Sequence, residues 1–198
     1  MRIGVLTDIH GNSVALDAVI ADARSAGVDR WWVLGDLVAM GPDPVGTLDR
    51  LRSLDPEVRV LGNTERYVLR GELPFPPADE LELTPKLVDR MVETAASFAW
   101  TKGSLDADAM AWLAESTARH ERTLADGTRV LAVHASATRD DGPGVSPDRS
   151  DAELLALFPD LDADLVLAGH THHVTDRVIG GTRFVNPGSI SNHVTDAR

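Results

Sequence analysis

The chain has 198 residues, of which 43% are hydrophobic and 25% charged, as in a globular protein, and this length suits one domain over residues 1–198. It has no cysteine, which excludes a disulfide framework, a zinc–thiolate site and a thiol nucleophile. The formal net charge of −12 disfavours non-specific binding to nucleic acid or to anionic membranes, so neither is an expected partner.

Short apolar runs alternate with amphipathic segments in the first third of the chain. The predicted strands are residues 3–7, 31–34 and 58–61, and the predicted helices are residues 13–26 and 44–54. The first helix has Asn12 or Ser13 as its N-cap and Gly27 as its C-cap, and the second begins near Pro44. This order of strands and helices predicts an α/β fold in which helices cover the sheet faces.

The rest of the chain mixes loops, helices and hairpins. Residues 71–84 and 135–149 are rich in turn-forming residues and are predicted to be loops. The further predicted helices are residues 85–100, 106–116 and 150–158. The further predicted strands are a hairpin of 122–124 with 130–133, a single strand at 165–168 and a hairpin of 174–179 with 183–185. The tryptophans are expected in the core: Trp31, Trp32, Trp100 and Trp112.

The N-terminus shows no targeting segment. The apolar run from Ile3 to Leu6 soon meets Asp8 and is shorter than the roughly 7–15 apolar residues of a signal peptide. No stretch approaches the ~20 apolar residues that span a membrane. We therefore expect a cytoplasmic protein.

The polar residues that stand out each follow the C-terminal end of a predicted strand or end one. They are Asp8, His10, Asp36, Asn63, His134, His170 and His172. Ligand sites in α/β sheets lie beyond the carboxyl ends of the strands, so loops that are far apart in sequence can converge there. Oxygen and imidazole ligands without thiolate suit Mn²⁺, Fe²⁺ and Zn²⁺. A carboxylate between two such ions can bridge them at about 3.5–4 Å.

Each of these short motifs is weak evidence by itself. An Asp-x-His pair is usually an ordinary loop, and Gly35-Asp36 or Gly62-Asn63 alone is most often a turn. The pair His170 and His172 is a stronger metal signal, because alternate residues of an extended chain point the same way. Together, in this order and each at a strand end, they predict a metal centre.

This ordered set resembles the calcineurin-like metallophosphoesterase superfamily. The matching motifs are Asp8-x-His10, Gly35-Asp36, Gly62-Asn63-x-Glu65, His134 and Gly169-His170-x-His172. The stretches 35–44 and Asn186-Pro187-Gly188-Ser189 resemble its small bacterial and archaeal phosphodiesterase branch. The resemblance implies one metallophosphoesterase domain, built as a four-layer α-β-β-α sandwich of two mixed sheets. Relatives usually have a further β-strand after the position of Ser189, so we expect the second sheet to be shortened at the C-terminus.

The resemblance also implies two divalent metal ions and their ligands. One ion would be held by Asp8, His10, Asp36 and His172, and the other by Asp36, Asn63, His134 and His170, with Asp36 as the bridge. Manganese is the expected metal, and iron, zinc, nickel and magnesium are alternatives. A hydroxide between the ions would attack phosphorus while Asn63 helps to stabilise the phosphoryl oxygens. These implications predict a metal-dependent phosphoesterase, in particular a phosphodiesterase of small phosphate esters.

The catalytic set implied by the resemblance is Asp36, Asn63, Thr64 and Glu65. Many relatives have a histidine at the position of Thr64, proposed as the general acid. A hydroxyl group has too high a pKa for efficient acid catalysis near neutral pH. We therefore expect activity mainly on esters with good leaving groups, unless His173 supplies the proton. We expect Glu65 to support the metal ligands without being a ligand itself. The expected substrate contacts are Asn12, Asn63 and His173.

Three alternatives are weighed against this function. Protein Ser/Thr phosphatases of the superfamily have Asp-Arg-Gly after the Gly-Asp motif, where this chain has Ala39-Met40-Gly41. A DNA nuclease is disfavoured by the acidic composition. A catalytically silent scaffold, like the metallophosphoesterase-like subunit of retromer, would have lost metal-binding histidines, and here every ligand position is kept.

Overall fold

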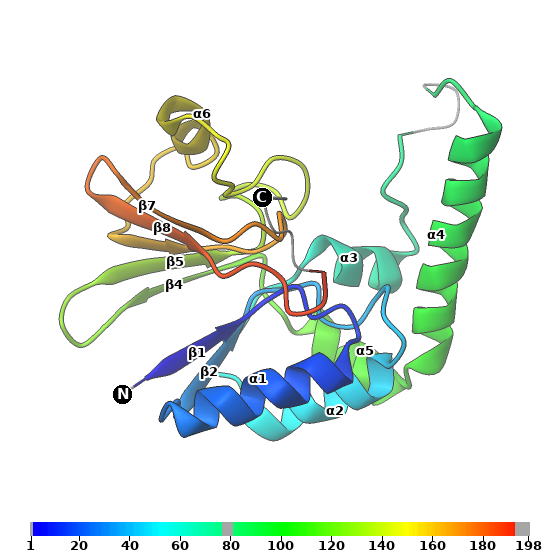
Figure 1. The fold of residues 1–198 in the computed structure, drawn as a ribbon, viewed down its shortest axis with the longest axis horizontal. Helices are drawn as coiled ribbons and strands as arrows, with labels where there is room; N and C mark the ends of the chain where they lie inside the picture. Colours follow the sequence, from blue (N-terminus) through cyan, green and yellow to red (C-terminus); the bar gives the residue numbers. More distant parts are fainter. Residues whose placement is uncertain (1, 77–80, 193–198) are drawn as a thin grey trace.

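Two β-sheets pack face to face in the computed structural model, which describes residues 2–76 and 81–192 (Figure 1). The contact between them is apolar and includes Trp32 of the first sheet, and Leu34 just after its strand, with Val130, Ala132 and Leu167 of the second sheet. Helices cover the outer side of each sheet. The chain therefore forms the four layers, α-β-β-α, that the resemblance implies.

The first sheet has three parallel strands in the order β1-β2-β3. They are β1 (Ile3–Leu6), β2 (Arg30–Val33) and β3 (Val58–Arg59), joined by helices α1 (Ser13–Ser25) and α2 (Pro44–Leu54). Each helix carries the chain back along the sheet, so the next strand starts at the same edge and runs parallel to the last. Within the described residues, the mixed character expected for both sheets is found only in the second.

Local sequence signals account for the boundaries of α1 and α2. The side chain of Asn12 caps α1 by accepting a hydrogen bond from the N–H of Ala15. The C-cap is Ala26 rather than Gly27, and Gly27 follows with a φ of 78°, a left-handed conformation that glycine adopts without strain. Pro44 lies in the first turn of α2, where its missing N–H costs nothing.

The second sheet has five strands in the order β4-β5-β6-β8-β7. They are β4 (Arg119–Thr123), β5 (Arg129–Val133), β6 (Leu165–Leu167), β7 (Thr175–Ile179) and β8 (Thr182–Asn186). Both predicted hairpins are present, as the antiparallel pairs β4/β5 and β7/β8, whereas β5, β6 and β8 run parallel. Helix α6 (Asp151–Ala156) packs on the outer face through Leu154, which is buried with Phe158 and Phe184.

Helix α3 (Asn63–Arg70) is absent from the prediction. It has only two turns, too few for a hydrophobic period to be recognised, and its sequence is mostly polar. The preceding strand is shorter than predicted, because it pairs only at Val58 and Arg59 and then makes one isolated bridge from Val60 to Thr117. The chain therefore enters a helix at Asn63, which places this residue at a helix N-terminus beside the ends of the strands.

Helices α4 (Pro85–Ser104) and α5 (Ala107–Ala114) follow the loop that contains residues 71–76, and α4 projects from the body of the molecule (Figure 1). The buried residues of α4 are Phe98 and Thr101. Trp100 is 51% exposed, so the prediction that it lies in the core is wrong. Residues two apart on a helix do not share a face, and Phe98 already occupies the inner one. Among the described residues, no helix has both the length and the apolar run that a membrane crossing requires.

Candidate metal centre

The predicted ligand residues converge at one edge of the two sheets, where β1, β2, β5 and β6 end and α3 begins. Six of them form two groups of three, and within each group the ligand atoms lie within 4.8 Å of one another. The first group is Asp8, His10 and His172, and the second is Asp36, His134 and His170. Asn63 contacts the second group. All seven residues that the sequence singles out are therefore brought together.

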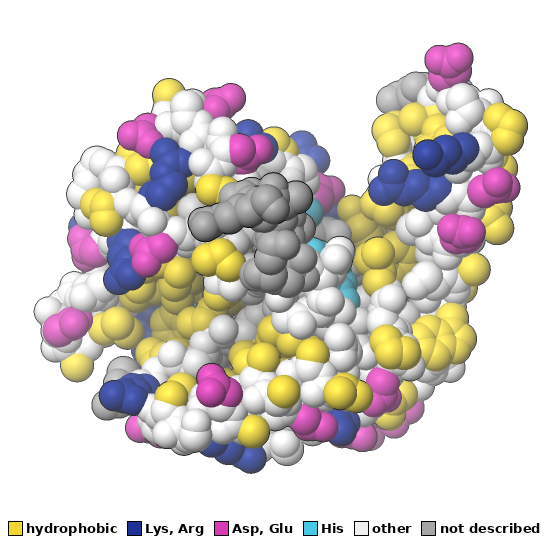
Figure 2. Space-filling model, viewed as in Figure 1, with side chains coloured by type: hydrophobic (Ala, Val, Ile, Leu, Met, Phe, Trp, Pro, Cys, Tyr) yellow, Lys and Arg dark blue, Asp and Glu magenta, His cyan; other side chains and the backbone are white. Residues whose placement is uncertain are grey.

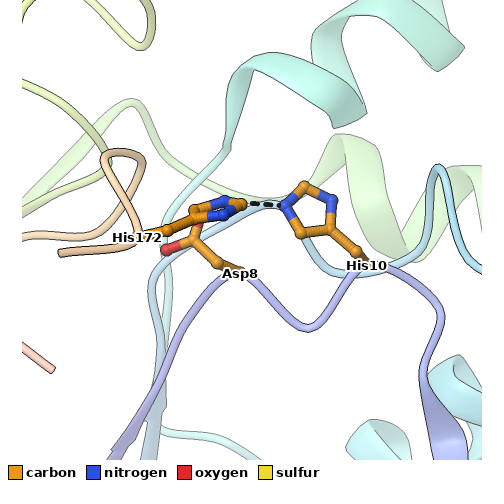
Figure 3. Close-up of side chains that lie close together, drawn as sticks. All are labelled: Asp8, His10 and His172. Atoms are coloured by element: carbon orange, nitrogen blue, oxygen red, sulfur yellow. Dashed lines mark hydrogen bonds and ion pairs between the residues drawn. The ribbon is translucent and has the colours of Figure 1, made fainter. Parts of the chain in front are cut away.

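The first group joins the loop after β1 to the loop after β6 (Figure 3). Nε2 of His10 lies 3.0 Å from Nε2 of His172. Nε2 of His172 in turn lies 3.3 Å from Oδ1 of Asp8. The Asp8 carboxylate also accepts a hydrogen bond of 2.9 Å from the backbone N–H of His170, so it links the two loops.

The second group is assembled around Asn63 at the start of α3. Oδ1 of Asn63 lies 3.1 Å from Nε2 of His134 and 2.9 Å from Nδ1 of His170. The opposite amide orientation would donate N–H to both ring nitrogens and suits a site without a cation. The orientation with the oxygen inward is the one that cation ligation requires.

Asp36 lies between the two groups. Its Oδ2 atom is 3.7 Å from Nε2 of His10, and its Oδ1 atom is 3.4 Å from Nε2 of His134. Each carboxylate oxygen thus faces a histidine of a different group. This is the arrangement that a bridging carboxylate needs.

Each of the four histidines is oriented by a hydrogen bond from its outer ring nitrogen to a backbone carbonyl. The bonds run from Nδ1 of His10 to Ala39 (3.2 Å), Nδ1 of His134 to Leu34 (2.6 Å), Nε2 of His170 to Gly142 (2.9 Å) and Nδ1 of His172 to Asn192 (3.1 Å). A carbonyl accepts, so in the neutral ring the proton lies on the outer nitrogen and the inner nitrogen keeps its lone pair. Ligating histidines in metalloproteins are held in the same way.

The donor atoms fit divalent cations. With these tautomers, the inner nitrogens of His10 and His172 face each other as two acceptors, and such a contact is repulsive unless a cation or a proton lies between them. The Asn63 amide can turn either its NH₂ group or its oxygen toward the inner nitrogens of His134 and His170, and only the oxygen could join them as a ligand of a cation. Nitrogen and oxygen donors without sulfur suit Mn²⁺, Fe²⁺ and Zn²⁺.

Strained backbone is concentrated at the ligand positions. Five ligand residues have a left-handed φ: Asp8 (53°), His10 (49°), Asp36 (55°), His170 (69°) and His172 (61°). Such a conformation costs a residue other than glycine roughly 1–2 kcal/mol. The neighbouring loops hold it in place, because the N–H of Asp8 donates to Gly35 (3.1 Å) and that of His10 donates to Asp36 (2.9 Å). Strain that the surrounding fold maintains is typical of functional sites.

Glu65 and Thr64 position Asp36. The buried Glu65 carboxylate accepts hydrogen bonds from the backbone N–H groups of Asp36 (2.7 Å), Leu37 (2.8 Å) and Gly62 (3.2 Å). Burial and the nearby charge of Asp36 raise the pKa of Glu65 to about 7. The Thr64 hydroxyl and backbone N–H both donate to Oδ1 of Asp36 at 2.9 Å. Thr64 is only 2% exposed, so it faces the carboxylate rather than the solvent.

Asp36 and His134 form a buried ion pair. Burial opposes ionisation of Asp36, but the charge of His134 and its hydrogen bond lower the pKa of Asp36 well below the ordinary range. Burial likewise lowers the pKa of His134, and the charge of Asp36 outweighs this effect and raises that pKa to about 10. A cation bound between them would have to displace the proton of His134.

Among the described residues, the predicted substrate contacts Asn12 and His173 make no hydrogen bond to a ligand side chain. Both groups of the Asn12 amide are in use, since Oδ1 caps α1 and Nδ2 donates to Oγ of Ser191 (3.4 Å). The pKa of Asp148 is lowered mainly by the hydrogen bond from Ser146, and nearby His173 makes a smaller contribution. The side chains of Asn12 and His173 are half-buried.

Asn186 is a site residue to which the sequence analysis gives no role. It is fully buried, and its amide NH₂ donates to the carbonyls of Gly169 (2.8 Å) and Val145 (3.1 Å) and to Oγ1 of Thr171 (2.9 Å). It therefore clamps the loop that carries His170 and His172. The Asn-Pro-Gly-Ser motif marks this residue in the sequence, but only its contacts reveal the function of the side chain.

Comparison with known proteins places the chain among phosphoesterases. Residues 1–198 match the family model of the calcineurin-like phosphoesterase superfamily domain. A Methanocaldococcus jannaschii protein is 28% identical over 176 residues, which cover 86% of this chain and 62% of that protein. A symmetrical bis(5'-nucleosyl)-tetraphosphatase of Pectobacterium atrosepticum is 44% identical over 64 residues, which cover 31% of this chain and 23% of that enzyme. The chain therefore spans less than two thirds of the length of these relatives.

A solved structure is similar over nearly the whole chain. The crystal structure of a metallophosphoesterase from Sphaerobacter thermophilus superposes with a TM-score of 0.71 at 27% sequence identity. The match covers 98% of this chain and 78% of that one. The layers and the order of the elements are thus those of a known family of folds.

Proposed function

Since the chain belongs to the calcineurin-like phosphoesterase superfamily, we propose that it hydrolyses small phosphate esters, in particular diesters, with two divalent cations held at the described centre. The observation that carries this proposal is the position of Asp36 between two groups of inward-facing donors. A single structural cation would need one such group, and a two-metal hydrolase needs two that share a carboxylate.

The proposed ligands follow the two groups. Asp8, His10, Asp36 and His172 would hold one cation, and Asp36, Asn63, His134 and His170 would hold the other. The orientation of each histidine by a backbone carbonyl supports this assignment, because it leaves the inner nitrogen free to ligate. Manganese is the proposed metal, with iron, zinc, nickel and magnesium as the alternatives that the same donors could hold.

When bound, the two cations would supply a water of lowered pKa as the nucleophile and would neutralise charge on the phosphoryl oxygens. The chain itself provides the positioning. Thr64 and Glu65 hold Asp36 and its loop, and Asn186 holds the loop of His170 and His172. Preorganisation of this kind lowers the cost of reaching the transition state.

Two features of Thr64 argue against its action as the general acid. Its hydroxyl proton is directed at Oδ1 of Asp36, and the residue is almost fully buried. We therefore propose that the preferred substrates have leaving groups that need no protonation. Asn12 and His173 remain proposed substrate contacts, and a cytoplasmic location remains part of the proposal.

A substrate panel with the purified chain tests this function. The chain is treated with a chelator, and manganese is then restored before bis(p-nitrophenyl) phosphate, p-nitrophenyl phosphate, cyclic nucleotides and dinucleoside polyphosphates are offered. We expect two manganese ions per chain and manganese-dependent hydrolysis that is fastest for an activated diester. The local similarity to a tetraphosphatase is the reason for including dinucleoside polyphosphates.

Two other outcomes would favour the alternatives. A chain that binds no manganese and turns over no ester would favour the catalytically silent scaffold. Faster hydrolysis of a phosphoserine peptide than of any small ester would favour a protein phosphatase. The sequence Ala39-Met40-Gly41 after the Gly-Asp motif makes the second outcome the less expected one.

A further inference from the structure

A cavity of about 460 Å³ opens beside the second ligand group. Asn63 and His170 are among its lining residues, so the cavity adjoins the proposed reaction centre. Its volume lies in the range of roughly 300–1,000 Å³ that is usual for small-molecule sites. Figure 2 shows histidine side chains in the hollow between the body and α4, with hydrophobic side chains beside them. A larger cavity of about 610 Å³, at β4 and β5, is lined by none of the seven predicted ligands in the described chain.

One wall of the cavity beside Asn63 is apolar. It is formed by the segment 73–76, which contributes Leu73, Pro74, Phe75 and Pro76. Tyr67 also lines the cavity but is only 5% exposed, because its ring packs against Phe98 at 5.4 Å and against the Arg66 guanidinium at 4.7 Å. The half-buried Phe75 is therefore the aromatic side chain of the wall that a bound molecule can reach.

The rest of the lining is polar, and its arginines are paired with a larger number of carboxylates. Arg66 pairs with Asp140 (2.7 Å), with Asp141 (2.9 Å) and with Glu72. Arg139 pairs with Asp141 at 2.7 Å. These carboxylates neutralise both guanidinium groups, so the wall offers hydrogen-bond donors and acceptors without an excess of positive charge. It therefore suits an uncharged polar group better than a second phosphate.

The same ion pairs fix the shape of the cavity. Glu72 precedes the apolar segment, and Asp140 and Asp141 precede Gly142, whose carbonyl orients His170. Arg66 therefore ties both walls to helix α3. The distance between the walls and the ligand group is set by contacts that exist before any substrate arrives.

We propose that this cavity binds the nucleoside of a nucleotide phosphodiester, with the base against Phe75 and the ester phosphate at the ligand residues. The inference rests on the proposed function and names its substrate class. A base has a flat apolar face for the 73–76 wall and a hydrogen-bonding edge for the wall of Arg66, Arg139 and Asp141. Stacking of a base on an aromatic side chain changes binding by roughly 5- to 150-fold.

The test compares two diesters that have the same charge and the same leaving group. They are thymidine 5'-(p-nitrophenyl phosphate) and methyl p-nitrophenyl phosphate, and hydrolysis releases p-nitrophenolate from each. In thymidine 5'-(p-nitrophenyl phosphate) the bond from phosphorus to the nitrophenol oxygen breaks, a bond to a water oxygen forms, and thymidine 5'-monophosphate remains. With manganese, we expect the KM of the thymidine diester to be about tenfold below that of the methyl diester.

Substitutions at Phe75 separate stacking from packing. Phe75→Ala and Phe75→Leu are both expected to abolish the preference in KM, because each removes the ring, whereas Phe75→Tyr should keep it. Val178→Ala, at an exposed apolar position on β7, is the matched control and should leave both diesters unchanged. A preference that survives in Phe75→Ala, or that is missing from the wild-type chain, overturns the proposal.

A binding measurement keeps this proposal separate from the proposed function. Calorimetry with thymidine 5'-monophosphate and manganese is carried out on the wild-type chain and on Phe75→Ala. If neither diester is hydrolysed, the proposed function fails, but binding that weakens about tenfold in Phe75→Ala would still support the nucleoside cavity. Binding that is equal in both chains overturns the cavity, whatever the activity.

Discussion

The Nε2 atoms of His10 and His172 lie 3.0 Å apart although 162 positions separate the two residues in the chain. Each ring donates its other N–H to a backbone carbonyl, so the two facing nitrogens both present lone pairs. The fold thus holds two acceptors in contact, and a cation between them would turn a repulsion into two bonds. The predictions below follow from this arrangement and from its counterpart around Asp36.

The affinity for manganese should rise with pH. In the cation-free chain the pKa of His134 is raised from 6.5 to about 10, mainly by Asp36 acting against burial. The contribution of the His134–Asp36 ion pair to the stability of the fold is complete below pH 6.5 and is lost as pH rises through about 10. A cation needs the neutral ring, so we expect the apparent affinity to rise up to about tenfold per pH unit between these values. Calorimetric titrations at several pH values, in buffers of different ionisation enthalpy, would measure the affinity and the released proton. A pH-independent affinity would contradict the prediction.

Asp36→Asn should abolish activity while the fold survives. The amide keeps the size of the carboxylate but removes the charge that faces His10 and His134. We expect the manganese content to fall below one ion per chain and kcat/KM to fall more than about 100-fold, which is about 2.7 kcal/mol in the activation free energy. Asp49→Asn, at an exposed position of α2, is the control. Full activity in Asp36→Asn would refute the bridging role.

Glu65→Gln should weaken the metal centre although Glu65 is not itself a proposed ligand. Both oxygens of Glu65 accept backbone hydrogen bonds, so the new NH₂ group would face N–H donors of Asp36 or Leu37. Leaving such donors unpaired costs about 1–3 kcal/mol of unfolding free energy. Denaturant unfolding and metal analysis measure the two effects, with Glu121→Gln on exposed β4 as the control. Unchanged stability and metal content would mean that Glu65 does not hold the loop.

Thr64→Val should separate orientation of Asp36 from acid catalysis. Valine has a similar shape but lacks the hydroxyl that donates to Oδ1 of Asp36 at 2.9 Å. We expect a loss of about tenfold in kcat/KM, equivalent to about 1.4 kcal/mol, for good and poor leaving groups alike. Thr64→Ser retains the donor and should remain close to wild type. A loss that is confined to poor leaving groups would instead assign proton donation to Thr64.

Asn186→Ala should loosen the loop that carries two of the histidines. The substitution leaves the buried carbonyl of Gly169 and Oγ1 of Thr171 without this donor, at a cost of about 1–3 kcal/mol of unfolding free energy. We expect a lower Tm and a weaker affinity for manganese. Asn192→Ala is the matched control, because the backbone carbonyl of Asn192, not its side chain, binds His172. Equal effects of both substitutions would argue against a specific clamp.

The elements with strong local signals are predicted well. Helix α2 has the predicted bounds, because Pro44 and the spacing of Leu48 and Leu51 are local features. Helix α3 is missed because two polar turns show no period, and its stability comes from packing of Tyr67 and Val68. The error at Trp100 has a similar origin. The sequence shows which residues of α4 are apolar, but the rest of the fold decides which of them are buried.

The sequence alone determined which residues can ligate a cation and where they stand relative to the strands, because residue type and hydrophobic period are properties of short segments. Only the tertiary structure decided that Asp36 faces two groups at once, which nitrogen of each histidine points inward, and that Glu65, Thr64 and Asn186 hold them. Those contacts join residues that the chain order keeps apart. They are set by the way two sheets pack across their apolar faces, and this packing depends on many side chains together.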